Sequence, residues 1–230
     1  MKTTSLITSA LAALALAALP AKAQTIYPDA TGDFTGGNAA LDISSVSVNN
    51  DASTITFTIN LGGDPTTATW ADYYIGISEN LFGGVGGNLN GSGGWGKSIQ
   101  MSTGGMDYFV GGYPGFAGYS LLTWTGSAWT TTTGTASENT TSVTLPVSLA
   151  ALGLSAGSSF QFDVWTSDSG GDNVLDALSD ATSRSWNSTA FDTGANALTY
   201  TVANVPEPTS LALIGLGSLF LIVRREASVR

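Results

Sequence analysis

The stretch Thr54–Leu61, TITFTINL, decides the fold class. Its four apolar residues alternate with threonines and one asparagine. A period of two puts the apolar side chains on one face of an extended strand and the polar ones on the other, and β-branched residues favour strands. The stretch therefore predicts a strand with one face in a core and the other in solvent.

The same alternation recurs along the chain. In residues 159–166, SFQFDVWT, Phe160, Phe162 and Val164 share one face and Trp165 lies on the other. Further short candidate strands, separated by turns rich in Gly, Asn and Asp, lie at 41–48, 72–78, 98–101, 107–110, 121–125, 128–132, 142–145 and 198–202. Many short strands with tight connections predict an all-β fold, an antiparallel, jelly-roll-like β-sandwich. Helix is expected only as a turn or two, at 147–154 and 174–179.

Both ends of the chain have the composition of processing segments. Lys2 precedes an apolar run at residues 6–19, and Ala21 and Ala23 form an A-x-A cleavage signal. This order of features predicts a secretory signal peptide at residues 1–23.

The C-terminal apolar stretch, residues 210–223, is followed by Arg224 and Arg225. As a helix it would span roughly 21 Å at 1.5 Å per residue, less than the ~30 Å hydrocarbon core. The stretch is therefore marginal as a permanent anchor, although bilayer thinning and snorkelling arginines would let it span. The arginines place the C-terminus in the cytoplasm and the signal peptide places the domain outside, so we expect a short transmembrane helix. We therefore expect three segments: the signal peptide, a β-sandwich domain at 24–204, and a tail at 205–230.

Composition excludes several functions. The chain has no cysteine and no histidine, which removes Ser-His-Asp and Cys-His triads and the usual zinc ligands. The formal net charge is −10, and Lys97 and Arg184 are the only basic residues between 24 and 204. So acidic a domain repels phosphate backbones, and we expect no nucleic-acid partner. GSGGWGKS, residues 91–98, matches the phosphate-loop pattern, but neither a buried strand before it nor a helix after it is predicted.

Two acidic groups are candidate calcium sites, because Ca²⁺ takes oxygen ligands from carboxylates on glycine-bearing loops. The candidate ligands are Asp29, Asp33 and Asp42 in the first group, and Asp168, Asp172 and Asp176 in the second. The spacing of an EF-hand is absent. Acidic surface turns without metal are the alternative reading.

Aromatic residues are the second candidate for binding, because sugars stack on aromatic rings beside polar groups. Tyr74 and Trp165 lie opposite the apolar phase of their strands, and Trp95 lies in a glycine-rich loop, so these three are the candidate glycan contacts. The other large aromatics are expected in the core.

The tail carries a specific resemblance. Val205-Pro206-Glu207-Pro208-Thr209-Ser210, an apolar helix and a basic terminus resemble the PEP-CTERM sorting signal. The resemblance implies that an exosortase recognises Pro206, Glu207 and Pro208 and removes the tail, with Arg224 and Arg225 as the basic stop. The protein would be held transiently in the inner membrane and then move to the cell surface or extracellular matrix, where such proteins accompany exopolysaccharide.

The body carries a second resemblance. DATGDFTGGNAALDISSVSV, followed by a strand and WADYYIGIS, is similar to DOMON-like and family-9-like carbohydrate-binding sandwiches. This implies a role in calcium binding for Asp29, Asp33 and Asp42.

Together these features predict an exported, non-catalytic, polysaccharide-associated binding module with calcium as a possible cofactor. A structural matrix protein without a specific ligand and a polysaccharide-cleaving enzyme, which needs two facing carboxylates but no histidine, are the alternatives.

Overall fold

A computed structural model describes residues 23–81, 99–113, 115, 118–169, 173–187 and 191–205. Several predicted features lie outside these residues: the signal peptide apart from Ala23, the candidate residues Trp95 and Asp172, and the tail from Pro206 onward with its predicted helix at 210–223. No helix in the described part of the chain has the length and apolar character needed to cross a membrane.

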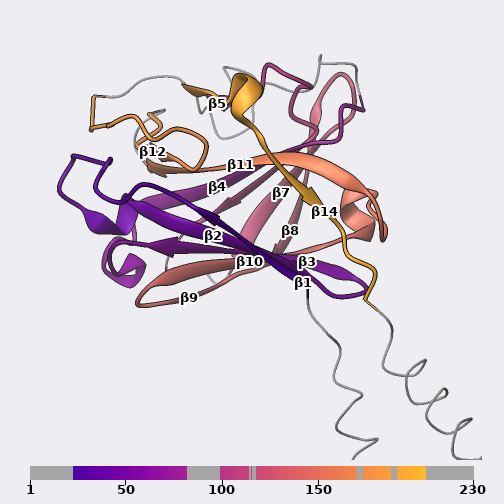
Figure 1. Cartoon of the computed structure of the whole chain (residues 1–230), viewed down its shortest axis with the longest axis horizontal. Helices are drawn as coiled ribbons and strands as arrows, with labels where there is room; N and C mark the ends of the chain where they lie inside the picture. The colour runs from indigo at the N-terminus through magenta and orange to yellow at the C-terminus, as the bar shows by residue number, and fades with distance from the viewer. Residues whose placement is uncertain are drawn as a thin grey trace, which may run out of the picture.

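The strands form two antiparallel sheets packed face to face (Figure 1). One sheet has five strands in the order β1 (Ala23–Pro28), β2 (Ile43–Asn50), β3 (Thr54–Leu61), β10 (Ser142–Ser148) and β9 (Ser137–Asn139). The other has seven, in the order β12 (Asp176–Ala177), β11 (Ser159–Asp168), β4 (Ala71–Ser78), β6 (Tyr108–Gly112), β7 (Gly118–Trp124) and β8 (Trp129–Thr135), with β14 (Leu198–Thr201) also paired to β11. A short parallel pair joins β13 (Phe191–Asp192) to β5 (Ile99–Gln100). The predicted all-β antiparallel sandwich is confirmed.

Strand β3 occupies the middle of the five-stranded sheet, as its alternation requires. Ile55, Phe57 and Ile59 are fully buried, while the threonines between them are half-buried on the outer face. Phe57 packs against Phe160 and Phe162 of β11 across the sandwich. The main core therefore lies between the two sheets, with β3 and β11 at its centre.

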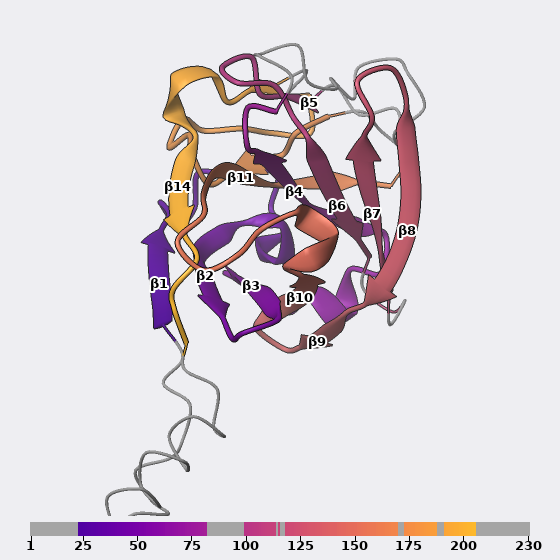
Figure 2. The ribbon, with the colours of Figure 1, turned by 90° about the vertical axis from the view of Figure 1, so that its right-hand side faces the viewer.

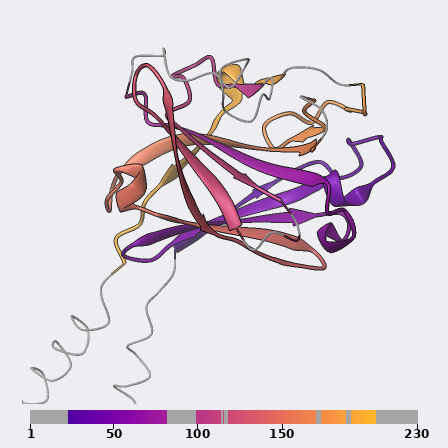
Figure 3. The same cartoon turned by 180° about the vertical axis from the view of Figure 1, so that it is seen from behind.

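The central strands of the seven-stranded sheet are buried on both faces: every residue of β4 and of β6 is buried. The outer face of this sheet holds a second apolar cluster that includes Tyr74 and Trp165, each 0% exposed. In Figures 1 and 3 the segments carrying β5 and β12 lie beyond this outer face, away from the five-stranded sheet. The expectation that Tyr74 and Trp165 reach solvent is therefore wrong, because these loop segments cover the face on which both rings lie.

The two predicted helical turns also need correction. Residues 147–154 contain only a 3₁₀ turn, η3 (Ala150–Leu152). Residues 174–179 contain no helix, because the backbone N–H groups of Leu175 and Leu178 donate to β11 carbonyls and β12 pairs with the same strand. The remaining 3₁₀ turns are η1 (Ala39–Leu41), η2 (Pro65–Thr67) and η4 (Gly194–Asn196).

The two ends of the domain lie side by side at Asn50. Ala23 pairs with Asn50, whose side-chain amide donates to the carbonyl of Ala203 and accepts from its N–H. Figure 2 shows β1 and the segment after β14 together at this end of the domain. Strand β2 runs from Ile43 to Asn50 and is about 25 Å long at ~3.4 Å per residue. The loop before Ile43 therefore lies about 25 Å from Asn50, at the other end of the domain.

The tight packing of the second cluster gives the first testable prediction. A Cβ on Gly76 would lie 2.4 Å from Cη2 of the buried Trp165. We expect Gly76→Ala to lower the free energy of unfolding by about 1–3 kcal/mol, measured by chemical denaturation, because overpacking forces side chains off their rotamers.

The matched control for this prediction is a second-site change. In a Trp165→Phe background the colliding ring atoms are absent, so the same Gly76→Ala change should cost less. Equal costs in both backgrounds would contradict the packing explanation.

Candidate metal centre and the aromatic pair beside it

The fold brings three carboxylates together at the end of the sandwich opposite Ala23 and Ala203. Asp33 and Asp42 lie in the loop between β1 and β2, and Asp176 lies in β12. One oxygen from each lies within 4.8 Å of the others, and the three residues are 7%, 7% and 2% exposed. The candidate site thus combines two members of the first predicted acidic group with one of the second.

Backbone hydrogen bonds position two of these side chains. Both oxygens of Asp42 accept from the N–H of Gly32 at 2.9 Å, and Gly32 has the positive φ (+83°) that the tight turn requires. Asp176 Oδ2 accepts from the N–H of Ile43 at 2.6 Å, and Oδ1 accepts from the N–H of Ala177. The first residue of β2 is therefore tied to the edge strand of the opposite sheet.

The site holds negative charge that no cation balances within the described residues. Both carboxylate oxygens of Asp33 and Oδ2 of the neighbouring Asp29 are buried without a hydrogen-bond partner. Burial raises the pKa of Asp176 to about 8 and that of Asp29 to about 7, and it raises the pKa of Asp33. The charged neighbours that shift these pKa values are all carboxylates. A bare cluster of this kind is costly, because buried charge needs a partner.

The donor set fits a hard divalent cation. Two oxygens that each lie ~2.4 Å from one ion are at most ~4.8 Å apart. The three carboxylate oxygens of this cluster all lie within 4.8 Å of one another. Carboxylate oxygens without any histidine or cysteine suit Ca²⁺ rather than Zn²⁺. Asp33 would supply the free oxygens, while Asp42 and Asp176 keep their backbone hydrogen bonds through the remaining lone pairs.

The other predicted calcium ligands within the described residues, Asp29 and Asp168, are not part of the three-carboxylate group. Asp29 neighbours the three carboxylates and acts electrostatically on Asp33 and Asp176 without belonging to the group. Asp168 lies at the end of β11 opposite Ala71 and is not part of the group either. The sequence indicated both acidic loops, but it did not show that they meet.

An exposed pair of tryptophans lies beside the metal site. Trp70 and Trp186 are 37% and 39% exposed, with ring centroids 5.6 Å apart and planes tilted by 47°. The indole N–H of Trp186 donates to the carbonyl of Gly36 at 2.8 Å, and the ring packs edge-to-face on Phe34. Since Phe34 follows Asp33 directly, Trp186 packs against the loop that carries Asp33 and Asp42.

Sequence reasoning missed these two residues by assigning them to the core with most other aromatics. A signal was present. Trp70 follows Thr66-Thr67-Ala68-Thr69, and Trp186 lies in SRSWNS, so neither belongs to an alternating strand pattern. A large aromatic among turn-forming residues is a better candidate for the surface than one in phase with a strand.

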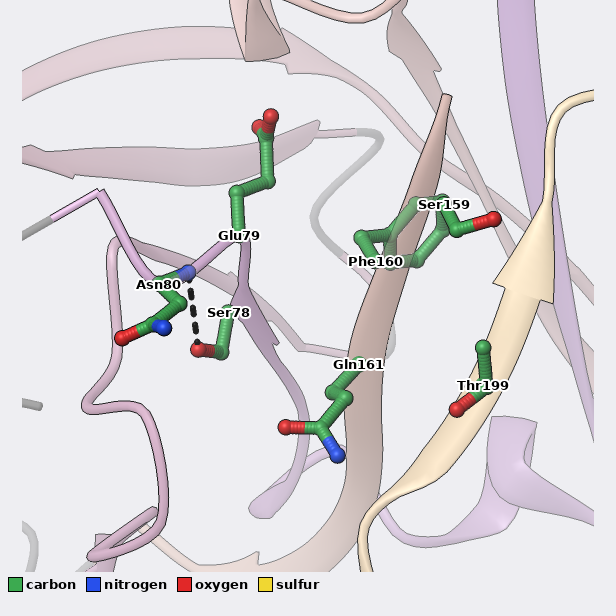
Figure 4. Close-up of a pocket in the computed structure, with 7 residues that line it drawn as sticks. All are labelled: Ser78, Glu79, Asn80, Ser159, Phe160, Gln161 and Thr199. Atoms are coloured by element: carbon green, nitrogen blue, oxygen red, sulfur yellow. Dashed lines mark hydrogen bonds between the residues drawn. The ribbon is translucent and has the colours of Figure 1, made fainter. Parts of the chain in front are cut away.

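A separate open pocket lies toward the other end of the seven-stranded sheet (Figure 4). It is lined by Ser78, Glu79, Asn80, Ser159, Phe160, Gln161 and Thr199. The Glu79 carboxylate points away from the side-chain amides of Asn80 and Gln161. Burial, and then the charge of Asp107, raises the pKa of Glu79 to about 7. Phe160 is only 2% exposed, so this pocket offers no ring face for stacking.

Comparisons with known proteins bear on the tail. The family model of the PEP-CTERM protein-sorting motif matches residues 204–226. No curated protein matches the chain. A solved structure described as "pH-induced modulation of Streptococcus parasanguinis adhesion by Fap1 fimbriae" is similar at 19% identity, covering 80% of this chain and 89% of that chain with a TM-score of 0.23. At that TM-score the likeness carries no argument.

The fold defines the chain as an antiparallel β-sandwich. The chain also carries the PEP-CTERM sorting signal that the sequence predicted. This signal supports the interpretation that the protein is exported, is a substrate of an exosortase, and is held transiently at the membrane by its C-terminal segment.

The metal site yields the second prediction. At a Ca²⁺ concentration about 100-fold above its dissociation constant, binding should stabilise the fold by about 2.7 kcal/mol and raise the melting temperature by about 5–10 °C. Asp33→Asn should abolish this rise, because Asp33 supplies the unpaired oxygens.

Asp64→Asn is the matched control, since Asp64 caps η2 and does not belong to the group of three carboxylates, and asparagine caps equally well. The same Ca²⁺ response in Asp33→Asn and in the unmodified protein, measured by calorimetry, would overturn the assignment.

Proposed function

We propose that this protein is an exported surface or matrix module that binds polysaccharide through Trp70 and Trp186 and uses Ca²⁺ at Asp33, Asp42 and Asp176 to hold that surface in place. The observation that carries the proposal is the exposed tryptophan pair, in which Trp186 is hydrogen-bonded to the loop that also provides two of the carboxylates.

The chemistry of the pair suits a sugar. Indole rings present large, rigid apolar faces that match the C–H faces of a pyranose ring, and neighbouring polar groups bind its hydroxyls. Asn173 and Ser169 lie beside the pair, because their N–H groups donate to the carbonyls of Trp186 and Trp70. An acidic chain with few cations favours an uncharged ligand over an anionic one.

Calcium has a positioning role in this proposal. The site joins the loop of residues 29–42 to β12, while the Trp186 indole is bonded to Gly36 within that loop. Neutralising the carboxylates would lower the cost of keeping the two segments together. Binding of polysaccharide is therefore expected to need Ca²⁺, although no sugar atom needs to touch the ion.

The position of the surface fits an anchored protein. The chain ends meet at Asn50, and the metal site lies at the start of β2, at its opposite end. With residues 1–23 as signal peptide and 205–230 as sorting tail, the sandwich at 24–204 would present its binding end away from the membrane. The proposal assigns no catalysis to the domain.

A structural matrix protein without a specific ligand is the second candidate. It is favoured by the burial of most large aromatics, including Tyr73, Tyr74 and Trp165, each 0% exposed.

The third prediction separates these two candidates. Trp70→Ala should weaken polysaccharide binding by at least about tenfold, a loss of ~1.4 kcal/mol, because half of the stacking surface is removed. Glycan arrays would identify the ligand, and calorimetric titrations with Ca²⁺ or with a chelator would measure its affinity.

Ile26→Ala serves as control, since Ile26 is 60% exposed on β1. Equal losses of affinity in both variants would contradict the assignment of the tryptophan pair as the binding surface. No binding by the unmodified protein in Ca²⁺ would favour the structural role.

The fourth prediction concerns the tail. Mass spectrometry of the mature surface protein should show a C-terminus upstream of Arg230, because the matched motif directs removal of the tail. Replacing Glu207 by Ala should leave the tail in place and the protein in the membrane fraction, whereas Thr209→Ala should be processed normally. A mature protein that still ends at Arg230 would refute exosortase processing.

A further inference from the structure

Strand β8 forms an open edge of the seven-stranded sheet. It pairs with β7 along its whole length, from Gly118 opposite Thr135 to Trp124 opposite Trp129. No other strand within the described residues pairs with its outer edge. Thr130, Thr131, Thr132 and Thr133 are all exposed. Figure 2 shows β8 at the rim of the molecule, beside β7.

This edge lacks the features that normally stop strands from pairing with other chains. Edges are usually protected by charge, proline, short length or a covering segment. β8 has seven residues, WTTTTGT, without charge or proline. The other edges are short or blocked: β9 has three residues including Glu138, and β1 ends at Pro28. The edge of β11 is paired with β12 and β14, which have only two and four residues.

We propose that β8 is a self-association edge, at which a second copy of this chain adds its own β8 in antiparallel register. This inference is independent of any sugar ligand. Two copies that each carry a net charge of −10 repel one another over most of their surface, so an uncharged strand is where they can approach.

The sequence of β8 is self-complementary in that geometry. A two-fold axis perpendicular to the sheet places one residue opposite its own copy and makes the contact isologous. With Thr131 on the axis, Thr131 faces its own copy, and Thr130 of each copy faces Thr132 of the other. Every central pair is then threonine with threonine. With Thr132 on the axis, Thr131 faces Thr133. Cross-strand Thr–Thr pairs hydrogen-bond and stabilise sheets, and threonine favours strands.

The absence of cysteine from the chain permits a clean test by cross-linking. Thr131→Cys and Thr132→Cys would be introduced singly into the exported protein and oxidised. Opposed residues in antiparallel strands have Cα atoms ~4.5–5.5 Å apart, within disulfide range. We expect efficient covalent dimers from whichever of the two lies on the axis. Ile26→Cys on the β1 edge is the control, and equal cross-linking there would indicate random collision and overturn the proposal.

A second measurement does not depend on cysteine. Sedimentation velocity across a range of concentrations should show a monomer–dimer equilibrium, and Thr131→Lys should raise its dissociation constant at least about tenfold by placing like charges together. Thr56→Lys on the outer face of β3 makes the same change elsewhere and should leave the constant unaltered. Near-UV circular dichroism would verify that both variants fold. A protein that is monomeric at all concentrations, or a dimer equally weakened by both substitutions, would refute the proposed edge.

Discussion

The structure depends on one constraint: both faces of the seven-stranded sheet are apolar at β4, β6 and β11, and both must be covered there. The five-stranded sheet covers the inner face through β3 and β10. The outer face carries Tyr74, Phe109 and Trp165, which would expose a large aromatic patch if left open. Loop segments from separate parts of the chain therefore fold back over it, contributing Met101, Met106, Val174 and Phe191. The five-stranded sheet needs no such cover, because serine, threonine and asparagine make up most of its outer face in β2, β3 and β10.

This cover assembles the candidate site. The segment after β11 returns along that strand as β12 and so brings Asp176 to the beginning of β2, where its carboxylate accepts from Ile43 N–H. The continuation of the same segment places Arg184 beside Phe34 in a backbone bridge and Trp186 against Gly36. The packing of an apolar face thus concentrates unpaired negative charge around Asp33. A cation would offset the cost of that charge, so the proposed metal binding would be coupled to core formation.

The strands that depend on local periodicity could be predicted from the sequence. The features that depend on packing between distant segments could not. Thr54–Leu61 has the predicted bounds, because its alternation matches one buried and one open face. Trp165 was assigned correctly to the face opposite Phe162, but alternation cannot reveal whether a loop covers that face. The short strands β12 and β13 escaped prediction because each has two residues and exists only through its partner strand. For the same reason, Asp33 and Asp176 were recognised as acidic loop residues in separate groups, while their contact arises from the return of β12 along β11.

The symmetry of the proposed dimer connects the open edge to the sorting tail. A two-fold axis perpendicular to the sheet at β8 turns one copy by half a revolution within the plane of the sheet. Each domain has its chain ends at Asn50 and its acidic site at the other end of β2, so the two copies present their terminal ends on opposite sides of the pair. Two copies whose tails are held in one membrane cannot both satisfy that arrangement. Copies freed by removal of the matched motif at 204–226 are under no such restriction. Tail cleavage would therefore release the protein and at the same time allow the threonine edges to pair, which would restrict the proposed self-association to the surface or matrix.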